Sequence, residues 1–231
     1  MTADHPAQES PARVAGLVLA AGAGRRYGMP KALVSYEGGL LVERAYRLVA
    51  DVCEVVIVVL GAAADEVRSR ADLGDAQVVI NRNWGTGMGS SLRTGLAALG
   101  PSSGGFRHNR HEADLAPAPG GFRQNRHSGS GPDLIDWELI DAALVHLVDL
   151  PGMTVAALRR IAGHAAADVL AVASYSGVRG HPVLIGRTHW VGVAAAAIGD
   201  QGARGYLATR DVLEVECADV ADPADLDYPP S

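Results

Sequence analysis

Glycines and cations crowd into one short stretch near the start of the chain, directly after an apolar run that ends at Ala20. The stretch reads Leu19-Ala20-Ala21-Gly22-Ala23-Gly24-Arg25-Arg26-Tyr27-Gly28-Met29-Pro30-Lys31. Its glycines can adopt positive φ and leave no Cβ in the way, so their N–H groups can point at phosphate oxygens. Arg25 adds a planar fork of donors, and Lys31 adds a mobile point charge. These residues predict a nucleoside triphosphate pocket at the end of the first strand.

A carboxylate stands where a second apolar run ends. Asp149 follows the run 143–148 and precedes Leu150-Pro151. A side chain at the carboxyl end of a parallel strand faces the side of the sheet where ligands bind. The other interpretation is a helix N-cap for the segment that starts near Thr154, where Asp is common.

Two further segments combine strand ends with polar or glycine residues. The first is Asn81-Arg82-Asn83-Trp84-Gly85-Thr86-Gly87-Met88-Gly89-Ser90-Ser91-Leu92. Free N–H groups in such a turn can contact a base edge or a ribose, although an ordinary helix opened by serines would have the same pattern. The second is Arg179-Gly180-His181-Pro182, which leads into an apolar run and would also suit a turn with proline at the first residue of a strand.

The elements that must position these residues alternate along the chain. Apolar runs without polar alternation predict buried strands at Val14–Ala20, Val55–Leu60, Val78–Ile80, Leu144–Val148, Val169–Ala173, Pro182–Ile185 and Val212–Cys217. Helical spacing of apolar residues predicts helices at Leu41–Val49, Ser91–Leu99, Val155–Ala167 and Trp190–Ile198. This alternation predicts an α/β fold with one Rossmann-like, mostly parallel sheet and helices on both faces, and with ligands at the carboxyl ends of the strands.

Composition limits the classes of function. The chain has 231 residues and a net charge of −6, which argues against a general nucleic-acid binder but not against binding one nucleotide. Its start carries acidic residues and no basic region of a signal peptide, and the first apolar run is too short to span a bilayer. Cys53 and Cys217 both lie in apolar sequence, which favours buried thiols in a reducing compartment over a single disulfide. We therefore expect a cytoplasmic protein that binds neither nucleic acid nor membrane.

The expected domain covers residues 13–231, after a disordered start at residues 1–12. Residues 101–132 break the pattern because they are dominated by Gly, Ser, Pro, Arg, His and Asn and contain a near-duplication of 104–111 at 120–127. We expect a disordered insertion there. The alternatives are a basic flap over an acidic ligand and metal binding by His108, His111 and His127.

The glycine-rich stretch resembles the signature L-x-(A/G)-G-x-(G/S)-x-R-(M/Y)-G-x-x-K of the MobA-like nucleotidyltransferases. Within that group the chain is most similar to the molybdenum cofactor cytidylyltransferase family. The segment from Asn81 to Leu92 matches the family's N-x-x-W-x-x-G-M-G-S-S-L almost letter for letter. Arg179 to Pro182 and the loop Gly199-Asp200-Gln201-Gly202-Ala203-Arg204 also match family motifs.

The resemblance implies a magnesium site. The family's Asp in a D-x-P motif holds Mg²⁺, and that position is Asp149 here. The family's D-x-D-T-P element supplies a second carboxylate, and Asp225-Leu226-Asp227-Tyr228-Pro229 resembles it with Tyr in place of Thr. Asp227 is the first choice for the second ligand, and Asp225 is the second choice. The element could also lie at residues 219–223, or the acidic segment could be a solvated tail.

The resemblance also implies a reaction: transfer of CMP from CTP to the phosphate of molybdopterin, with release of pyrophosphate and Mg²⁺ as cofactor. Arg25, Lys31 and Asp149 would be catalytic. The nucleotide would contact Leu19, Ala20, Ala21, Gly22, Gly24, Arg25, Lys31, Asn81, Gly87, Ser90 and Ser91. The acceptor would contact Arg179, Gly180, His181, Pro182 and Arg204. A molybdoenzyme that receives the cofactor would be a partner.

The form Leu19-Ala20-Ala21-Gly22 goes with cytidine in the resembling families, whereas L-A-G-G goes with guanosine.

Three other functions stay open. One is a nucleotidyltransferase that uses another nucleoside triphosphate or a sugar or isoprenoid phosphate. Another is a non-catalytic nucleotide-binding chaperone for the cofactor. The last is a dinucleotide-binding oxidoreductase, which would require an acidic residue after the second strand, where Gly61 stands.

Overall fold

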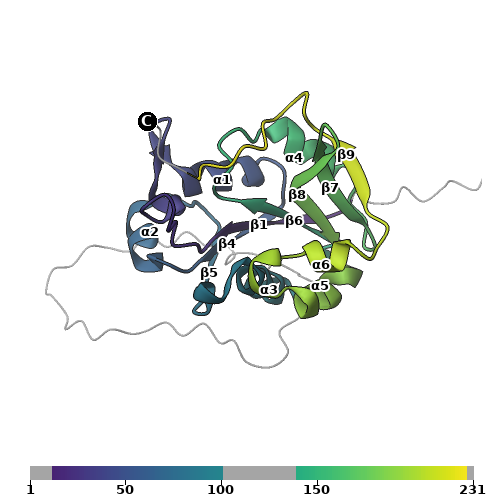
Figure 1. The fold of residues 1–231 in the computed structure, drawn as a ribbon, viewed down its shortest axis with the longest axis horizontal. Coiled ribbons are helices and arrows are strands. Elements are labelled where there is room, and N and C mark those ends of the chain that lie inside the picture. Colours follow the sequence, from purple (N-terminus) through teal and green to yellow (C-terminus); the bar gives the residue numbers. More distant parts are fainter. Residues whose placement is uncertain (1–11, 101–138, 228–231) are drawn as a thin grey trace, which may run out of the picture.

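The protein is built around one seven-stranded sheet with helices on both faces (Figure 1). The computed structural model describes residues 12–100 and 139–227. The expected disordered start and the expected insertion at 101–132 lie almost wholly outside these described residues. The strands of the sheet are β1 (Val14–Ala20), β4 (Val55–Leu60), β5 (Gln77–Ile80), β6 (Ala142–Leu147), β7 (Leu170–Tyr175), β8 (Val178–Gly186) and β9 (Leu213–Glu216).

The sheet is mostly parallel, as predicted. Its strand order is β5-β4-β1-β6-β8-β7-β9, and only β8 runs antiparallel to its two neighbours. Leu19 at the end of β1 pairs with Val59 of β4 on one side and with Leu147 of β6 on the other. The loops that leave these three strands therefore emerge at the same edge of the sheet, and the start of β8 reaches this edge from the opposite direction.

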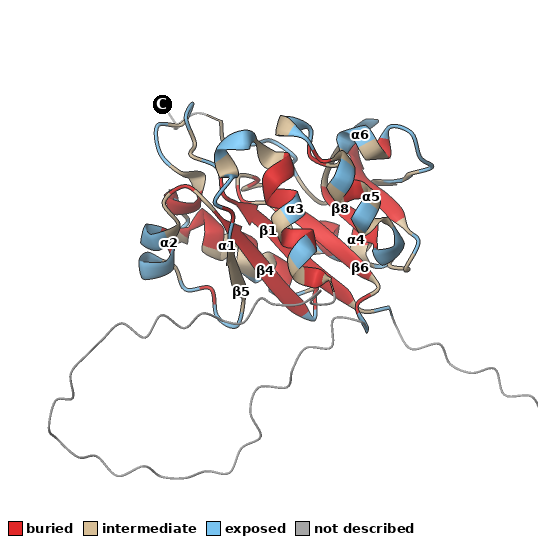
Figure 2. Ribbon diagram, turned by 90° about the horizontal axis from the view of Figure 1, so that it is seen from below, coloured by how far each residue is buried: buried red, intermediate tan, exposed pale blue. Residues whose placement is uncertain are grey.

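Two helical layers cover the sheet. One face packs against α1 (Leu41–Ala50), α2 (Ala64–Arg70) and α4 (Val155–Ala162), and the other packs against α3 (Met88–Leu99), α5 (Trp190–Ala196) and α6 (Arg204–Leu207). Strands β1 and β4 are buried along their whole length, while the outer faces of the helices are exposed (Figure 2). Burial on both faces explains why these strands are continuous apolar runs.

Several boundaries differ from the predicted ones. Helix α4 ends at Ala162 rather than Ala167, because Gly163 follows it and the chain turns there. Helix α3 begins at Met88, with Gly87 and not a serine at its N-cap. The short α2 was not predicted, since Val67 is its only buried residue. The small hairpin of β2 (Ser35–Tyr36) and β3 (Gly39–Leu40) was not predicted either.

Both cysteines are buried free thiols, so the structure has no disulfide between them. Within residues 12–100 and 139–227, no helix is both long enough and apolar enough to cross a bilayer.

Candidate active site

A cavity of about 620 Å³ opens where β1 and β6 end, and we call it the larger cavity. Its walls come from three loops, from the start of α3, and from the last described residues of the chain. The predicted site residues that line it are Leu19, Ala21, Gly22, Gly24, Arg25, Lys31, Gly87, Ser91, Asp149, Arg204 and Asp227. Asp225, the second choice for a metal ligand, also lines it, as do residues outside the predicted set, among them Arg26, Trp84 and Asp200.

The glycine loop, residues 21–31, connects β1 to the turn at Lys31–Leu33. Gly24 has φ +58°, and a Cβ there would lie 1.8 Å from the carbonyl oxygen of Met29. Gly28 has φ +90°, and its N–H donates to the carbonyl oxygen of Gly24 across 2.8 Å. The loop therefore folds back on itself in a way that only glycine allows at position 24. This brings Lys31 to the floor of the larger cavity beside Asp149.

Lys31 lies between two carboxylates. Its Nζ donates to Asp149 Oδ2 across 2.8 Å and to Asp227 Oδ1 across 2.9 Å. Burial alone would lower the pKa of Lys31, but the hydrogen bonds to Asp149 and Asp227 together with the negative charges of these two side chains outweigh burial and raise it. Lys31 and Arg26 in turn hold the pKa of Asp227 below its usual value. The amine of Lys31 and the carboxylate of Asp227 are thus charged at neutral pH.

Asp227 reaches this position because residues 217–227, the C-terminal strap, cross the loop between β6 and α4. The N–H of Asp222 donates to the carbonyl oxygen of Gly152 across 3.1 Å, and the N–H of Leu226 donates to that of Asp149 across 2.9 Å. A Cβ on Gly152 would lie 2.7 Å from Asp222, so the strap packs directly on this glycine. The segment is anchored rather than a solvated tail.

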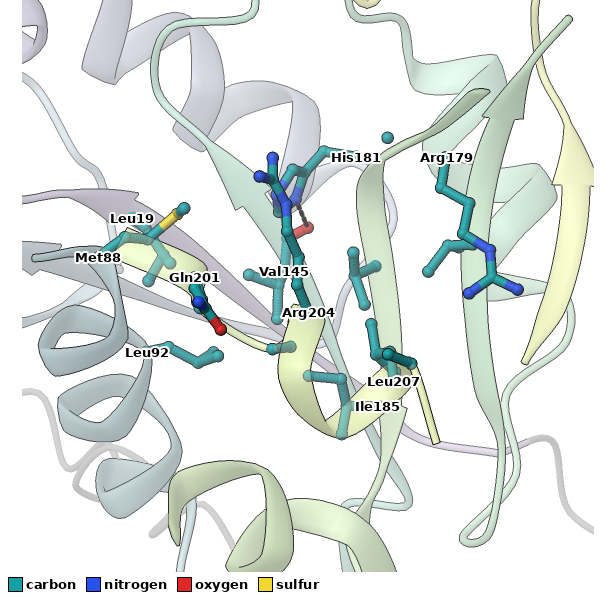
Figure 3. A pocket seen from close by; sticks show the side chains of 16 residues that line it. Leu19, Met88, Leu92, Val145, Arg179, His181, Ile185, Gln201, Arg204 and Leu207 are labelled. Atoms are coloured by element: carbon teal, nitrogen blue, oxygen red, sulfur yellow. Dashed lines mark hydrogen bonds between the residues drawn. The ribbon is translucent and has the colours of Figure 1, made fainter. Parts of the chain in front are cut away.

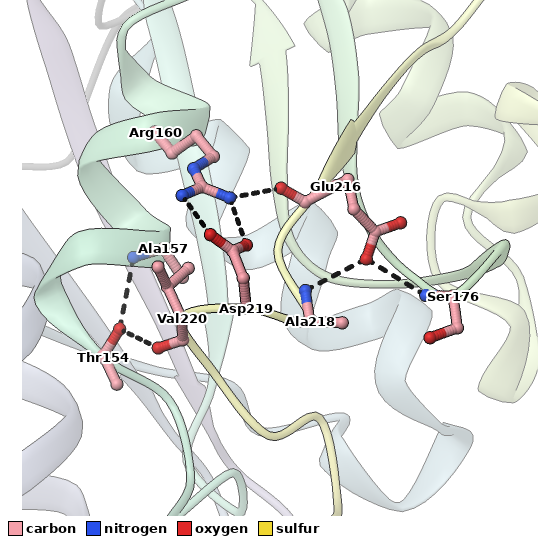
Figure 4. A network of polar contacts seen from close by, with 8 residues as sticks. All are labelled: Thr154, Ala157, Arg160, Ser176, Glu216, Ala218, Asp219 and Val220. Atoms are coloured by element: carbon pink, nitrogen blue, oxygen red, sulfur yellow. Dashed lines mark hydrogen bonds and ion pairs between the residues drawn. The ribbon is translucent and has the colours of Figure 1, made fainter.

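Asp219 lies elsewhere. Its two carboxylate oxygens accept from the guanidinium of Arg160 at 2.6 and 2.9 Å, on the outer side of α4 (Figure 4). The same figure shows that Thr154, not Asp149, caps α4, because the Thr154 hydroxyl accepts from the N–H of Ala157. The alternative of Asp149 as a helix cap is therefore wrong, and Asp219 lies away from the larger cavity.

The segment after β5 is held by a buried network. Asn81 Nδ2 donates to Ser90 Oγ at 2.8 Å and to Ser91 Oγ at 3.1 Å, while its Oδ1 accepts from the N–H of Asn83. Asn81 and Ser90 are buried and do not line the larger cavity, whereas Gly87 and Ser91 do. In this structure Asn81 and Ser90 shape the loop from beneath instead of facing the cavity.

A smaller cavity of about 250 Å³ adjoins the larger one (Figure 3). The two cavities share Leu19, Met88 and Arg204 in their walls. Of the residues predicted to bind the acceptor, Arg179, Gly180, His181 and Arg204 line the smaller cavity, and Pro182 does not. The side chain of Arg179 pairs with Glu214 at 2.8 Å and points away from His181 and Arg204.

Two histidines lie on opposite faces of the sheet near this edge. His181 Nδ1 lies 3.3 Å from the carbonyl oxygen of Val145, and burial lowers the pKa of its ring. His146 is buried in β6 on the side of α1 and α4, and burial lowers its pKa to about 3. Both rings are therefore neutral at physiological pH.

The donor set fits a hard divalent cation. Asp149 and Asp227 converge on one cationic atom, and Mg²⁺ is typically held by one or two carboxylates, waters and substrate phosphates. No cluster of three or more His, Cys, Asp or Glu side chains suited to a metal occurs among residues 12–100 and 139–227. A cation at this point would therefore need oxygen atoms from water or from a bound ligand to complete its coordination.

Comparison with known proteins agrees with this geometry. The model of the MobA-like NTP transferase domain matches residues 16–215. The chain belongs to this family. Nicotine blue oxidoreductase from Paenarthrobacter nicotinovorans is 32% identical over 225 residues, which cover 93% of this chain and 92% of that protein. A probable molybdenum cofactor guanylyltransferase from Bacillus cytotoxicus is 45% identical over 53 residues, which cover 23% and 27% of the two chains.

Solved structures share the MobA-like fold. The crystal structure of an Rv0371c homologue from Mycobacterium sp. strain JC1 superposes with a TM-score of 0.67 at 25% identity and covers 94% of this chain and 91% of that one. Rv0371c from Mycobacterium tuberculosis in complex with manganese has a TM-score of 0.61 at 24% identity, with 88% of each chain covered.

Proposed function

We propose that the protein transfers CMP from CTP to the phosphate of a molybdopterin-type acceptor and releases pyrophosphate. The observation that carries this proposal is the convergence of Lys31, Asp149 and Asp227 beneath the glycine loop, in a cavity that shares part of its wall with a second, more apolar one. A polyanion and a divalent cation would satisfy the charges of the larger cavity, and a second substrate would have its own compartment.

In this mechanism the triphosphate lies along the glycine loop. Arg25 and Lys31 bind its phosphates and neutralise the charge that develops on the departing pyrophosphate. Lys31 must leave its ion pairs with Asp149 and Asp227 to do so, and those two carboxylates would then hold Mg²⁺. When bound, Mg²⁺ offsets negative charge on the α-phosphate.

The acceptor phosphate needs no general base. A phosphate monoester has a second pKa near 6 and is mostly ionised at neutral pH, so no histidine has to remove a proton. The obstacle is repulsion between two anions, and positioning with charge neutralisation lowers it. Arg204 borders both cavities, so we assign it to the acceptor phosphate. Gly87 and Ser91 would contact the nucleotide, and Asn81 and Ser90 would position them.

The preference for CTP rests on Ala21. Its methyl group is buried in the wall of the larger cavity and would crowd a purine base. We also propose that the product passes to a molybdoenzyme.

Pyrophosphate release tests the function. The purified protein is incubated with each nucleoside triphosphate, with and without molybdopterin, in Mg²⁺ or in EDTA, and the product mass is measured. We expect pyrophosphate and a CMP-linked product only when CTP, acceptor and Mg²⁺ are all present. Nucleotide binding without any transfer would instead support a cofactor chaperone, and a sugar or isoprenoid phosphate as the sole productive acceptor would replace molybdopterin.

A second candidate function is an oxidoreductase, because the relative that matches nearly the whole chain bears that name. The larger cavity would then hold a nicotinamide dinucleotide, and the smaller one would hold the ring to be reduced. Gly61 stands where a typical dinucleotide fold places the acid that binds the ribose, which is evidence against this alternative. Oxidation of NADH or NADPH in the presence of a heteroaromatic acceptor, without pyrophosphate release, would favour it.

A further inference from the structure

Lys31 contacts both carboxylates that would hold a metal ion. Its Nζ lies 2.8 Å from Asp149 Oδ2 and 2.9 Å from Asp227 Oδ1. A divalent cation bound by the same two oxygens would therefore lie close to this Nζ, and positive charges at such short range repel each other. The ammonium and a metal ion thus compete for the same pair of carboxylates.

The second oxygen of Asp227 also has a cationic partner. Arg26 Nη1 donates to Asp227 Oδ2 across 3.1 Å, so both oxygens of this carboxylate are engaged. Two basic side chains, Lys31 and Arg26, are in this way matched with two acidic ones, Asp149 and Asp227. A free divalent cation would add two positive charges that nothing in this pairing balances.

The pairing is held in place by the fold. The side chains of Lys31 and Asp149 are only 14% and 21% exposed. The turn at Gly24 positions Lys31 on one side, and the backbone bond of Leu226 to Asp149 positions the strap on the other. A metal ion that displaced the ammonium would leave a mostly buried cation without a partner, which is costly. A metal ion on its own should therefore bind weakly.

A triphosphate would remove this obstacle. Lys31, Arg25 and the glycine loop line the same cavity, so phosphate oxygens bound there would give the ammonium a new partner. The two carboxylates would then be available to a metal ion, which in turn would screen them from the phosphates. Each ligand thus favours the binding of the other.

We propose that Lys31 is a resident cation that closes the carboxylate pair to free divalent cations, so that the metal ion and the triphosphate bind cooperatively. Because binding free energies are reciprocal, the triphosphate raises the affinity for the metal by the same factor as the metal raises that for the triphosphate. This inference rests on the proposed function in one respect, namely that the larger cavity takes a nucleoside triphosphate.

Binding of Mn²⁺ to the metal-free full chain tests the inference without any turnover. Electron paramagnetic resonance measures free Mn²⁺ during a titration without nucleotide. We expect Lys31→Met to bind Mn²⁺ at least about tenfold more tightly than the wild type, a factor within the usual range of coupling between sites. A lysine that served only to bind phosphates would leave this affinity unchanged when removed, so the direction of the change is diagnostic.

Arg26→Met is the matched control. Arg26 also pairs with Asp227, but its side chain is 72% exposed and it has no hydrogen bond or ion pair to Asp149. Its removal should change Mn²⁺ affinity by less than about threefold, because an exposed ion pair contributes little. Lys31→Gln, which keeps a polar side chain of similar length without the charge, replaces Lys31→Met if that variant does not fold.

Three results separate the possibilities. Unchanged or weaker Mn²⁺ binding in a folded Lys31→Met or Lys31→Gln would overturn the inference. Binding to the nucleotide-free wild type with a Kd below about 10 μM would overturn it whether or not the variants fold. Tighter Mn²⁺ binding in the Lys31 variants, together with no CMP transfer by the wild type, would contradict the proposed function and leave the resident cation standing.

Discussion

The N–H of Leu226 donates to the carbonyl oxygen of Asp149 across 2.9 Å, and this bond ties the C-terminal strap to the end of β6. It brings Asp227 within hydrogen-bonding distance of Lys31, which also donates to Asp149. The three side chains come from segments far apart in the sequence and form the charged centre of the larger cavity.

Loss of the charge of Lys31 or of Asp149 should slow the transfer reaction. We expect Lys31→Ala and Asp149→Ala each to lower the rate of pyrophosphate release at saturating substrates by at least about a hundredfold, or about 2.7 kcal/mol of transition-state stabilisation. Arg68→Ala removes an exposed cation of α2 outside both cavities and serves as the control. Near-normal rates in both site variants would refute their assigned roles.

Two of the four aspartates of the strap, Asp219 and Asp227, should behave differently. Asp227→Asn removes the charge of one of the two carboxylates that would hold Mg²⁺, so we expect the Mg²⁺ concentration for half-maximal rate to rise about tenfold or more. Asp219→Asn is the matched control, because Asp219 pairs with Arg160 away from the cavity. A larger effect from Asp219 than from Asp227 would reverse the assignment of the metal ligand.

Ala21 should set the base preference. We expect the wild-type protein to favour CTP and Ala21→Gly to shift the ratio of kcat/KM values toward GTP by about tenfold, or about 1.4 kcal/mol, because the methyl group no longer crowds a purine. Ala23→Gly removes a methyl group from the same loop and should leave the ratio unchanged. Equal use of CTP and GTP by the wild type would remove the basis of this prediction.

Gly87 should tolerate no side chain. It has φ +104°, and a Cβ there would lie 2.4 Å from the backbone of Gly199. Gly87→Ala should lower the free energy of unfolding by about 1–3 kcal/mol and displace the loop that carries Asp200. A Cβ at Gly85 would meet nothing within 4 Å, so the urea concentration at which Gly85→Ala is half unfolded should equal that of the wild-type protein. Identical denaturation midpoints for the two variants would contradict this account.

Acid should destabilise the fold through its buried histidines. The pKa of His146 falls to about 3 in the folded protein, compared with about 6.5 in the unfolded chain. Between these values the unfolded chain binds a proton that the folded one does not, so stability decreases as the pH drops, by up to about 1.4 kcal/mol per pH unit. The lowered pKa of His181 acts in the same direction.

Urea denaturation between pH 4.5 and 7 measures this effect. His146→Leu should flatten the dependence of stability on pH, and replacement of the exposed His164 by Leu should not. An equally steep dependence in His146→Leu and the wild type would show that the ring titrates alike in both states.

The sequence predicted the sheet well because burial on both faces leaves long apolar runs without alternation, as in β1 and β4. It predicted the ends of α4 and α5 poorly, since apolar residues continue past the point where each helix stops. Helix α2 buries one side chain, so its pattern is too weak to detect.

The candidate site could be predicted only in part. The glycines, Lys31 and Asp149 stand in recognisable local patterns, but the choice between Asp219 and Asp227 depends on long-range contacts of the strap with Gly152 and Asp149. The roles of Asn81 and Ser90 were also hidden, because a buried amide that bonds two serines has the same residue types as one that binds a ligand. Spacing in the sequence does not record which way a polar group faces.

Lys31 and Asp227 are separated by 196 positions, so the ribosome must translate almost the whole domain before the second carboxylate exists. A nascent chain that has folded through β9 already has its glycine loop, yet it still lacks one wall of the charged centre. A chain terminated shortly after β9 would keep its sheet and glycine loop but lack Asp227, so under the proposed function it should fold without transferring the nucleotide.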